Sequence, residues 1–156
     1  MFKVFLFVVL FAVAIIFFTL FRNGANLTEP PGAVKRLAVF LSISSAATDD
    51  NHSLAELRTP TFNVDARTLY TQVLDAAAEL GWSVLAHDSD VLDANFEVRS
   101  PALLFEDDLY VQVKSMGDQQ SSLHMRSASR KGGADFAANS GHIQKLVKHL
   151  KAKVNH

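Results

Sequence analysis

Charged, amide and hydroxyl side chains that could bind a ligand or transfer a proton cluster in the second half of the chain. They fall at the expected ends of strands and in the segment that follows them: Arg99, Asp107, Asp108, Arg126, Ser127, Ser129, Arg130, Asp135 and Asn139. When successive strands pair antiparallel through short connections, one strand ends beside the start of the next. We therefore expect these side chains to gather along one rim of a sheet, and we call this set the polar rim.

Different kinds of chemistry remain open for the polar rim. Arginine–aspartate pairs could hold two loops and the last helix in place, with serine hydroxyls satisfying backbone groups. Alternatively, Arg99 or Arg130 could bind a carboxylate or phosphate of a small ligand. Asp107 and Asp108 could also form an acid pair. Consecutive residues of a strand face opposite sides, however, so these two carboxylates would not easily share a proton. We assign no catalytic residue.

The remaining residues with possible chemistry do not have the spacing of a metal or cofactor site. His142 and His149 lie two helical turns apart, which is too far for one ion. Asp88, Asp90 and Asp93 begin like a calcium loop but lack its glycine and its final glutamate. The chain has no cysteine and no glycine-rich phosphate loop. We therefore expect no metal and no cofactor.

The elements that must position the polar rim are indicated by their periodicity. Asp65 is a good N-cap for a helix whose apolar residues recur at helical spacing up to Gly81. Alternating apolar residues then predict antiparallel strands near 82–86, 91–98, 109–113 and 123–129. A glycine loop at 132–133 precedes a final helix, with Asn139 or Ser140 as its N-cap. We expect a two-layer α+β domain, in which two helices cover an antiparallel sheet of four to five strands.

The first stretch of the chain is apolar enough to span a membrane. From Val4 to Phe21 no residue is charged, and Lys3 and Arg22 bracket the run. A helix of this length measures about 27 Å, close to the hydrocarbon thickness of a bilayer. A cleaved signal peptide is the alternative, but its apolar region is usually shorter and its cleavage site more distinct. We expect a transmembrane anchor over residues 1–22.

A linker and the soluble domain should follow this anchor. Glycine and proline residues interrupt any regular structure over 23–36, which we take as the linker. The soluble domain then covers 37–156. Its first element could be a short strand, because Leu37, Val39, Leu41 and Ile43 alternate with other residues.

Composition and charge exclude some classes of function. The chain has 156 residues, a formal net charge of −1 and 49% hydrophobic residues, as expected for a folded domain rather than a disordered one. Basic residues are not interleaved with aromatic ones, so nucleic-acid binding is not expected. Acidic residues dominate 44–121 and basic residues 122–156. Either the two parts neutralise each other, or the last helix offers a basic face to anionic lipid or an acidic partner.

Several sequence motifs resemble one family. They are Phe96-Glu97-Val98-Arg99-Ser100-Pro101, Phe105-Glu106-Asp107-Asp108 and His124-Met125-Arg126-Ser127-Ala128-Ser129-Arg130, followed by Gly133, Asp135 and Asn139. This pattern resembles the domain-of-unknown-function 1499 family, and the similarity extends over residues 42–151. Many members carry a cysteine pair ahead of the Ser44-Ser45 motif. Here Ser42 stands in place of the second cysteine, so any thiol, disulfide or metal role of that pair is lost.

The resemblance implies a bacterial or plastid protein, often with a hydrophobic leader or membrane segment and with no established activity. Together with the anchor, it favours a single-pass membrane protein that is not an enzyme and acts as an accessory subunit of a membrane complex. Its partners would be membrane lipid along residues 4–21 and another membrane protein. The family context favours an extracytoplasmic soluble domain. The alternative function is a small-ligand-binding or enzymatic domain that uses the polar rim.

Overall fold

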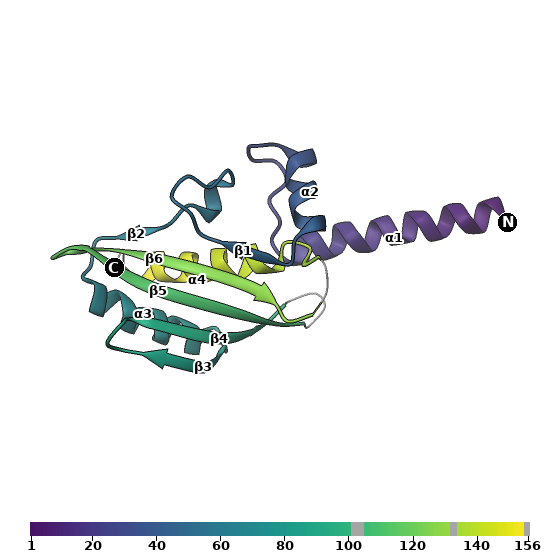
Figure 1. The fold of residues 1–156 in the computed structure, drawn as a ribbon. Coiled ribbons are helices and arrows are strands. Elements are labelled where there is room, and N and C mark those ends of the chain that lie inside the picture. The colour runs from purple at the N-terminus through teal and green to yellow at the C-terminus, as the bar shows by residue number, and fades with distance from the viewer. Residues whose placement is uncertain (101–104, 132–133, 155–156) are drawn as a thin grey trace.

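The computed structural model describes residues 1–100, 105–131 and 134–154 (Figure 1). The elements follow the chain in this order: α1 (Phe2–Arg22), α2 (Ala33–Ser42), β1 (Ser45–Ala47), the 3-10 helix η1 (Ala55–Leu57), β2 (Thr61–Phe62), α3 (Ala66–Glu79), β3 (Ser83–Asp88), β4 (Asp93–Arg99), β5 (Glu106–Gly117), β6 (Gln120–Ser129) and α4 (Ala138–Val154). The glycine loop expected at 132–133, and with it Gly133 and Pro101 of the family motifs, lies outside the described residues.

The described strands form one antiparallel sheet, which confirms the α+β class. Its order is β1-β6-β5-β4-β3, and β2 also pairs with β6. β1 lies opposite residues 126–128 of β6, and β2 lies opposite residues 121–122. Both short strands therefore line the same side of β6. Within the described residues the sheet has six strands rather than four to five, because two short strands, β1 and β2, both pair with β6 in addition to the four longer strands.

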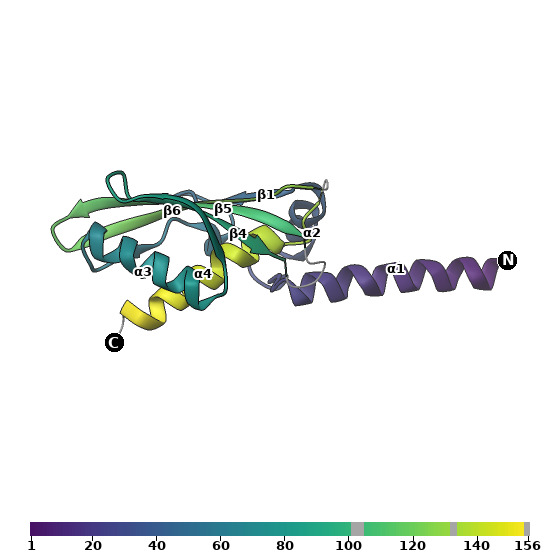
Figure 2. The same ribbon diagram turned by 90° about the horizontal axis from the view of Figure 1, so that it is seen from below.

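Two helices cover one face of the sheet, as expected. Figure 2 shows α3 and α4 side by side beneath the strands. Leu69 and Val73 of α3, Ile143 and Leu146 of α4, and Phe96 of β4 are all 0% exposed. The apolar stripes read from the helical spacing thus meet the inward side chains of the strands, and this contact forms the core.

The ends of α3 are those that the sequence predicts. The Asp65 carboxylate accepts hydrogen bonds from the backbone N–H groups of Arg67 and Thr68 at 3.0 and 2.9 Å. Beyond its other end, Gly81 has a φ of 73°, a left-handed conformation that suits glycine. Short-range capping chemistry determines both limits of this helix.

The strand expected at residues 37–43 is wrong, because this segment belongs to α2. The segment as a whole also fits a helical period, which includes residues outside the alternating set. Arg36 and Phe40, four residues apart, both face the interior, and Val34 and Leu41, seven apart, both face outward. The N-cap expected for α4 is also wrong. Neither Asn139 nor Ser140 caps the helix, since both lie within it and Asp135 supplies the capping carboxylate.

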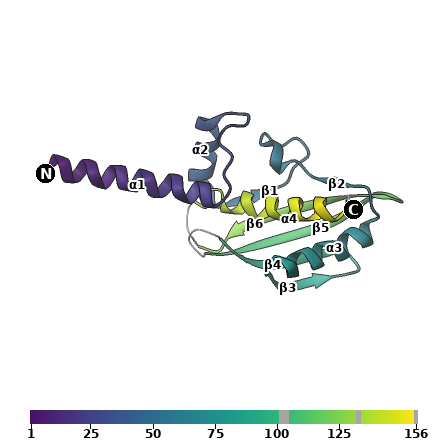
Figure 3. The same cartoon turned by 180° about the vertical axis from the view of Figure 1, so that it is seen from behind.

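α1 is an apolar helix that meets the domain at its C-terminal end and projects from it over the rest of its length (Figures 1 and 3). Its most apolar window has a mean hydropathy of 3.2, and only 11% of that window is buried. Thr19 and Leu20, near its end, are its buried residues. By length and composition, α1 is apolar enough to cross a membrane, and it is the one such helix among the described residues.

Candidate functional site

The strand pairing brings most of the polar rim to the end of the sheet that lies next to α1, but it divides the set between two faces. Arg99 at the end of β4 pairs in register with Glu106 at the start of β5. Asp107 pairs with Ser129 near the end of β6. Successive side chains of a strand point to opposite faces, so Asp107 turns toward the helices and Asp108 turns away. The rim therefore consists of an outer and an inner half.

The outer half is an ion-pair cluster around Arg130. Its guanidinium lies 2.8 Å from Glu97, 3.3 Å from Glu106 and 2.7 Å from Asp108. The hydrogen bonds to Asp108 and Glu97 raise the pKa of Arg130 above its ordinary value. Arg130 would have to leave these carboxylates to bind an anionic ligand. The charge of Arg130 is therefore already paired within the protein, at the surface of the sheet.

The two other arginines of the rim are differently placed. Arg99 has a side chain that is 67% exposed and lies 3.6 Å from Glu106, a loose contact. Arg126 is exposed and pairs in register with Tyr110, further along the outer face of the sheet. The structure therefore does not bring Arg126 together with the inner residues of the set.

The inner half is organised around Asn139, which is 0% exposed. Its side-chain nitrogen donates to the Ser44 carbonyl at 2.9 Å and to the Ser129 hydroxyl at 3.0 Å. Its side-chain oxygen accepts from the Ser127 hydroxyl at 2.5 Å. One amide thus joins α4 to β6 and to the chain entering β1, and both its nitrogen and its oxygen bond to groups of the protein.

Asp135 caps the start of α4. Its carboxylate accepts from the backbone N–H groups of Ala137 at 2.9 Å and of Asn139 at 3.1 Å. Between cap and helix, Phe136 and Ala137 have φ angles of 50° and 69°, which are uncommon for residues with a side chain. Burial raises the pKa of Asp135, against the hydrogen bonds from Asn139 and Ala137, and the nearby Asp107 raises it further.

Asp107 forms a buried pair with His142, a residue outside the expected rim. Their side chains are 1% and 3% exposed, and Nε2 of His142 lies 2.8 Å from Oδ2 of Asp107. Within the described part of the chain, Oδ1 of Asp107 has no hydrogen-bond partner. Trp82 contacts the imidazole edge-on, with ring centroids 6.4 Å apart.

A cavity of about 340 Å³ opens beside this pair, where the end of α1 meets α4 and β4. It is lined by Arg22, Asn23, Gly24, Trp82, Val98, Arg99, Ala138, Gly141, His142 and Lys145. The charged side chains among these residues are basic and come from α1, β4 and α4. A small anion therefore fits the charge of this cavity better than a cation does.

α1 is joined firmly to the start of α4 at this place. Asn23 is 5% exposed, and its side-chain nitrogen donates to the carbonyl oxygen of Phe136 at 2.9 Å. A Cβ atom at Gly141 would lie 2.4 Å from the Asn23 carbonyl oxygen, so only glycine fits this close approach. The direction of α1 relative to the domain is thus set by packing and hydrogen bonds.

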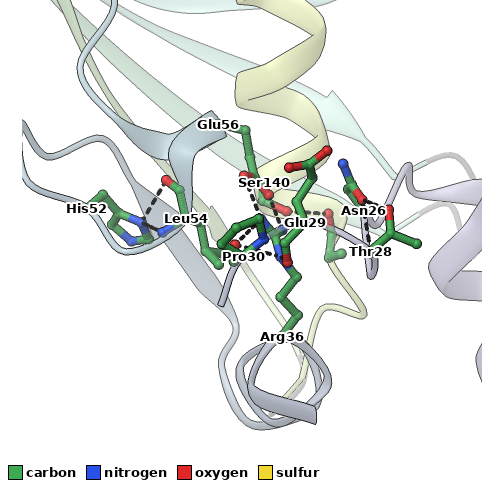
Figure 4. A network of polar contacts seen from close by, with 10 residues as sticks. Asn26, Thr28, Glu29, Pro30, Arg36, His52, Leu54, Glu56 and Ser140 are labelled. Carbon is green, nitrogen blue, oxygen red and sulfur yellow. Dashed lines mark hydrogen bonds and ion pairs between the residues drawn. The ribbon is translucent and has the colours of Figure 1, made fainter. Parts of the chain in front are cut away.

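A second buried polar network ties α2 to η1 (Figure 4). Arg36 is 0% exposed and donates to the carbonyl oxygens of Glu29 at 2.9 Å and Pro30 at 2.7 Å. Its guanidinium also forms a two-point ion pair with Glu56. Burial would raise the pKa of Glu56, but hydrogen bonds, including those from Arg36, lower it below its ordinary value.

Sequence reasoning missed both buried side-chain pairs, Asp107 with His142 and Arg36 with Glu56, for a common reason. The partners lie 35 residues apart for Asp107 and His142, and 20 apart for Arg36 and Glu56, and no motif links them. One weak signal existed for His142. It lies one helical turn after Asn139, on the same face of α4, so it had to face the sheet.

The comparisons with known proteins identify the family. The family model DUF1499, described as a protein of unknown function, matches residues 28–150. No curated protein matches the chain. A solution NMR structure of a Thermobifida fusca protein is similar at 8% identity and a TM-score of 0.43, covering 72% of this chain and 89% of that one. The matched residues run from α2 through the sheet to α4. The chain belongs to the DUF1499 family of proteins of unknown function.

Proposed function

We propose that this protein is a single-pass membrane protein in which α1 crosses the bilayer. Its α+β domain acts on the extracytoplasmic side as a non-enzymatic accessory subunit of a membrane complex. The observation that carries the proposal is the exposed apolar surface of α1, where Phe5, Phe7 and Phe18 are 68%, 69% and 62% exposed. Exposing this apolar surface to water costs about 25 cal/mol of free energy per Å². In lipid the cost disappears, and a helix satisfies its own backbone groups there.

The junction between α1 and α4 supports a docking role for the domain. Because Asn23 is buried and bonded to the turn before α4, the domain is held in one orientation relative to the helix. A partner in the same membrane would therefore meet the same surface of the domain in every copy. Because the domain is already oriented by α1, less rotational freedom is lost when a partner binds, and association costs less free energy.

Membrane extraction tests the spanning helix. The full chain is expressed with its first residue intact, and membranes are washed with alkaline carbonate. We expect the protein to stay in the membrane fraction. The double variant Leu10→Arg/Val13→Arg should lose this retention, because each arginine near the middle of a span costs about 2.5–3.5 kcal/mol.

A matched control adds the same charge far from α1. Val91 and Met116 are both 54% exposed and lie near the β3–β4 and β5–β6 turns, away from α1 (Figure 1). Val91→Arg/Met116→Arg should remain in the membrane fraction. Release of the unmodified protein by carbonate would contradict the spanning helix.

The accessory-subunit role is tested by purification in mild detergent. We expect a membrane protein to co-purify in a fixed ratio with the full chain. A monodisperse monomer in every detergent tried would count against this role. The side of the membrane is tested in sealed cells with an external protease, which should cleave the domain only if it is extracytoplasmic.

The cavity beside His142 favours a second candidate, the binding of a small anion. Basic residues on α1, β4 and α4 line this cavity, and the buried Asp107–His142 pair adjoins it. Inorganic phosphate added to the full chain should change the fluorescence of Trp82, which also lines the cavity. Lys145→Gln should weaken this response, whereas Arg126→Gln, outside the cavity, should not. No response of Trp82 to phosphate would exclude this candidate.

A further inference from the structure

α2 exposes apolar side chains and buries a charged one, the reverse of a helix on the surface of a water-soluble domain. Val34 is 82% exposed and Leu41 is 41% exposed, whereas Arg36 is 0% exposed. Ala38, also exposed, lies between the two apolar residues at helical spacing. These three residues form the α2 stripe.

The exposure of the α2 stripe follows from the way in which the opposite side of α2 is held. Arg36 is held beneath α2 by the carbonyl oxygens of Glu29 and Pro30 and by the Glu56 carboxylate. Phe40, one turn later on the same side, is 2% exposed. These buried contacts fix the rotation of α2 about its axis, and the opposite side must then face outward.

The position of α2 identifies the surface that this stripe meets. Figures 1 and 3 show α2 lying crosswise to α1, at the point where α1 enters the domain. If α1 crosses a bilayer, a crosswise helix at its end lies in the plane of the membrane–water interface. α1 exposes apolar side chains up to Phe21, which is 81% exposed, so an exposed apolar surface already reaches the level of α2.

We propose that α2 is an interfacial helix, with Val34, Ala38 and Leu41 inserted at the boundary between lipid headgroups and acyl chains. This inference rests on the proposed function, since it takes α1 as the spanning helix. Lys35, exposed beside the stripe, reaches the lipid phosphates while its aliphatic stem stays in the apolar layer. Lipid contact also removes the cost of the exposed valine and leucine.

Contacts of both α1 and α2 with the bilayer would restrict the orientation of the domain more than α1 does alone. A spanning helix alone leaves α1 and the domain attached to it free to rotate together about the membrane normal and to tilt together. The interfacial α2 removes the tilt and places the adjoining end of the sheet, with Arg99 and Arg130, toward the membrane surface. The outer half of the polar rim would then face lipid headgroups.

Depth measurements on the full chain test the inference. The chain has no cysteine, so single cysteines can be labelled without removing others. Val34→Cys, Ala38→Cys and Leu41→Cys report on α2, Leu10→Cys on α1, and Val91→Cys and Met116→Cys serve as exposed controls. Each variant carries an environment-sensitive fluorophore and is reconstituted into phosphatidylcholine–phosphatidylglycerol vesicles, with and without brominated acyl chains.

We expect the fluorophore to show a blue-shifted emission and quenching by bromine at every position of the α2 stripe and at position 10. The controls should show neither. Quenching at position 10 without quenching on α2 would overturn the inference and leave the proposed function standing. Absence of quenching at position 10 would overturn the spanning helix, and the inference with it. A blue-shifted emission of the α2 stripe that appears only when a co-purified protein is present, without quenching by bromine, would also overturn the inference. It would indicate that a protein partner covers the stripe.

Discussion

Replacing Asn139 with alanine tests whether the inner half of the polar rim is scaffold. The substitution removes one fully buried bond, to Ser127, and two partly buried ones, to Ser44 and Ser129. A buried polar group left without a partner costs about 1–3 kcal/mol, and a partly buried bond about 0.5–1.5 kcal/mol. We therefore expect Asn139→Ala to lower the free energy of unfolding by about 2–6 kcal/mol.

The assay follows the single tryptophan during guanidinium unfolding of the full chain in nanodiscs. Trp82 packs against Phe96 with ring centroids 6.4 Å apart and reports on the core of the domain. Gln144→Ala, a partly exposed position on the same helix, is the control and should change the free energy by about 0.5 kcal/mol or less. A loss below about 1 kcal/mol for Asn139→Ala would refute the scaffold interpretation.

Other predictions concern the junctions and the ion pairs. Gly141→Ala should lower the free energy of unfolding by about 1–3 kcal/mol, because the added Cβ would overlap the Asn23 carbonyl oxygen. Unchanged stability would show that α1 can shift away from α4 at this contact. Arg130→Ala should lower stability only slightly, because its ion pairs are at the surface; unfolding on this substitution would make the outer half structurally essential. The folded-state pKa of Glu56 lies below 4.5, so its stabilising contribution is complete above pH 4.5 and is lost as the pH falls through the folded-state pKa. Denaturation curves at several pH values should show this loss, and Glu56→Gln should flatten it.

The parts of the fold that could be predicted depend on short-range chemistry. The α3 helix was predictable because Asp65 and Gly81 mark its ends and its apolar residues repeat at one clear period. The four longer strands, β3 to β6, were predictable because apolar residues alternate along their segments, as at Ala94, Phe96 and Val98. The short strands β1 and β2 carry too few residues for such a pattern. These signals lie within the segment that they describe.

α2 could not be assigned in this way, because its apolar residues satisfy two periods at once. The helix also makes contacts that reach outside it, among them the ion pair of buried Arg36 with Glu56. The polar rim shows the same limit. Strand pairing predicted which residues would meet at one end of the sheet, but the pairing of Asp107 with His142 depends on how α4 lies across that sheet. Such contacts between distant segments leave no local pattern.

The claim that α1 remains attached and spans the bilayer is tested most directly by the intact mass of the mature protein purified from membranes. The account predicts a mass that includes the whole of Phe2–Arg22, found in the carbonate-resistant fraction. A mature chain that starts near Asn26 and is recovered free in solution would contradict it.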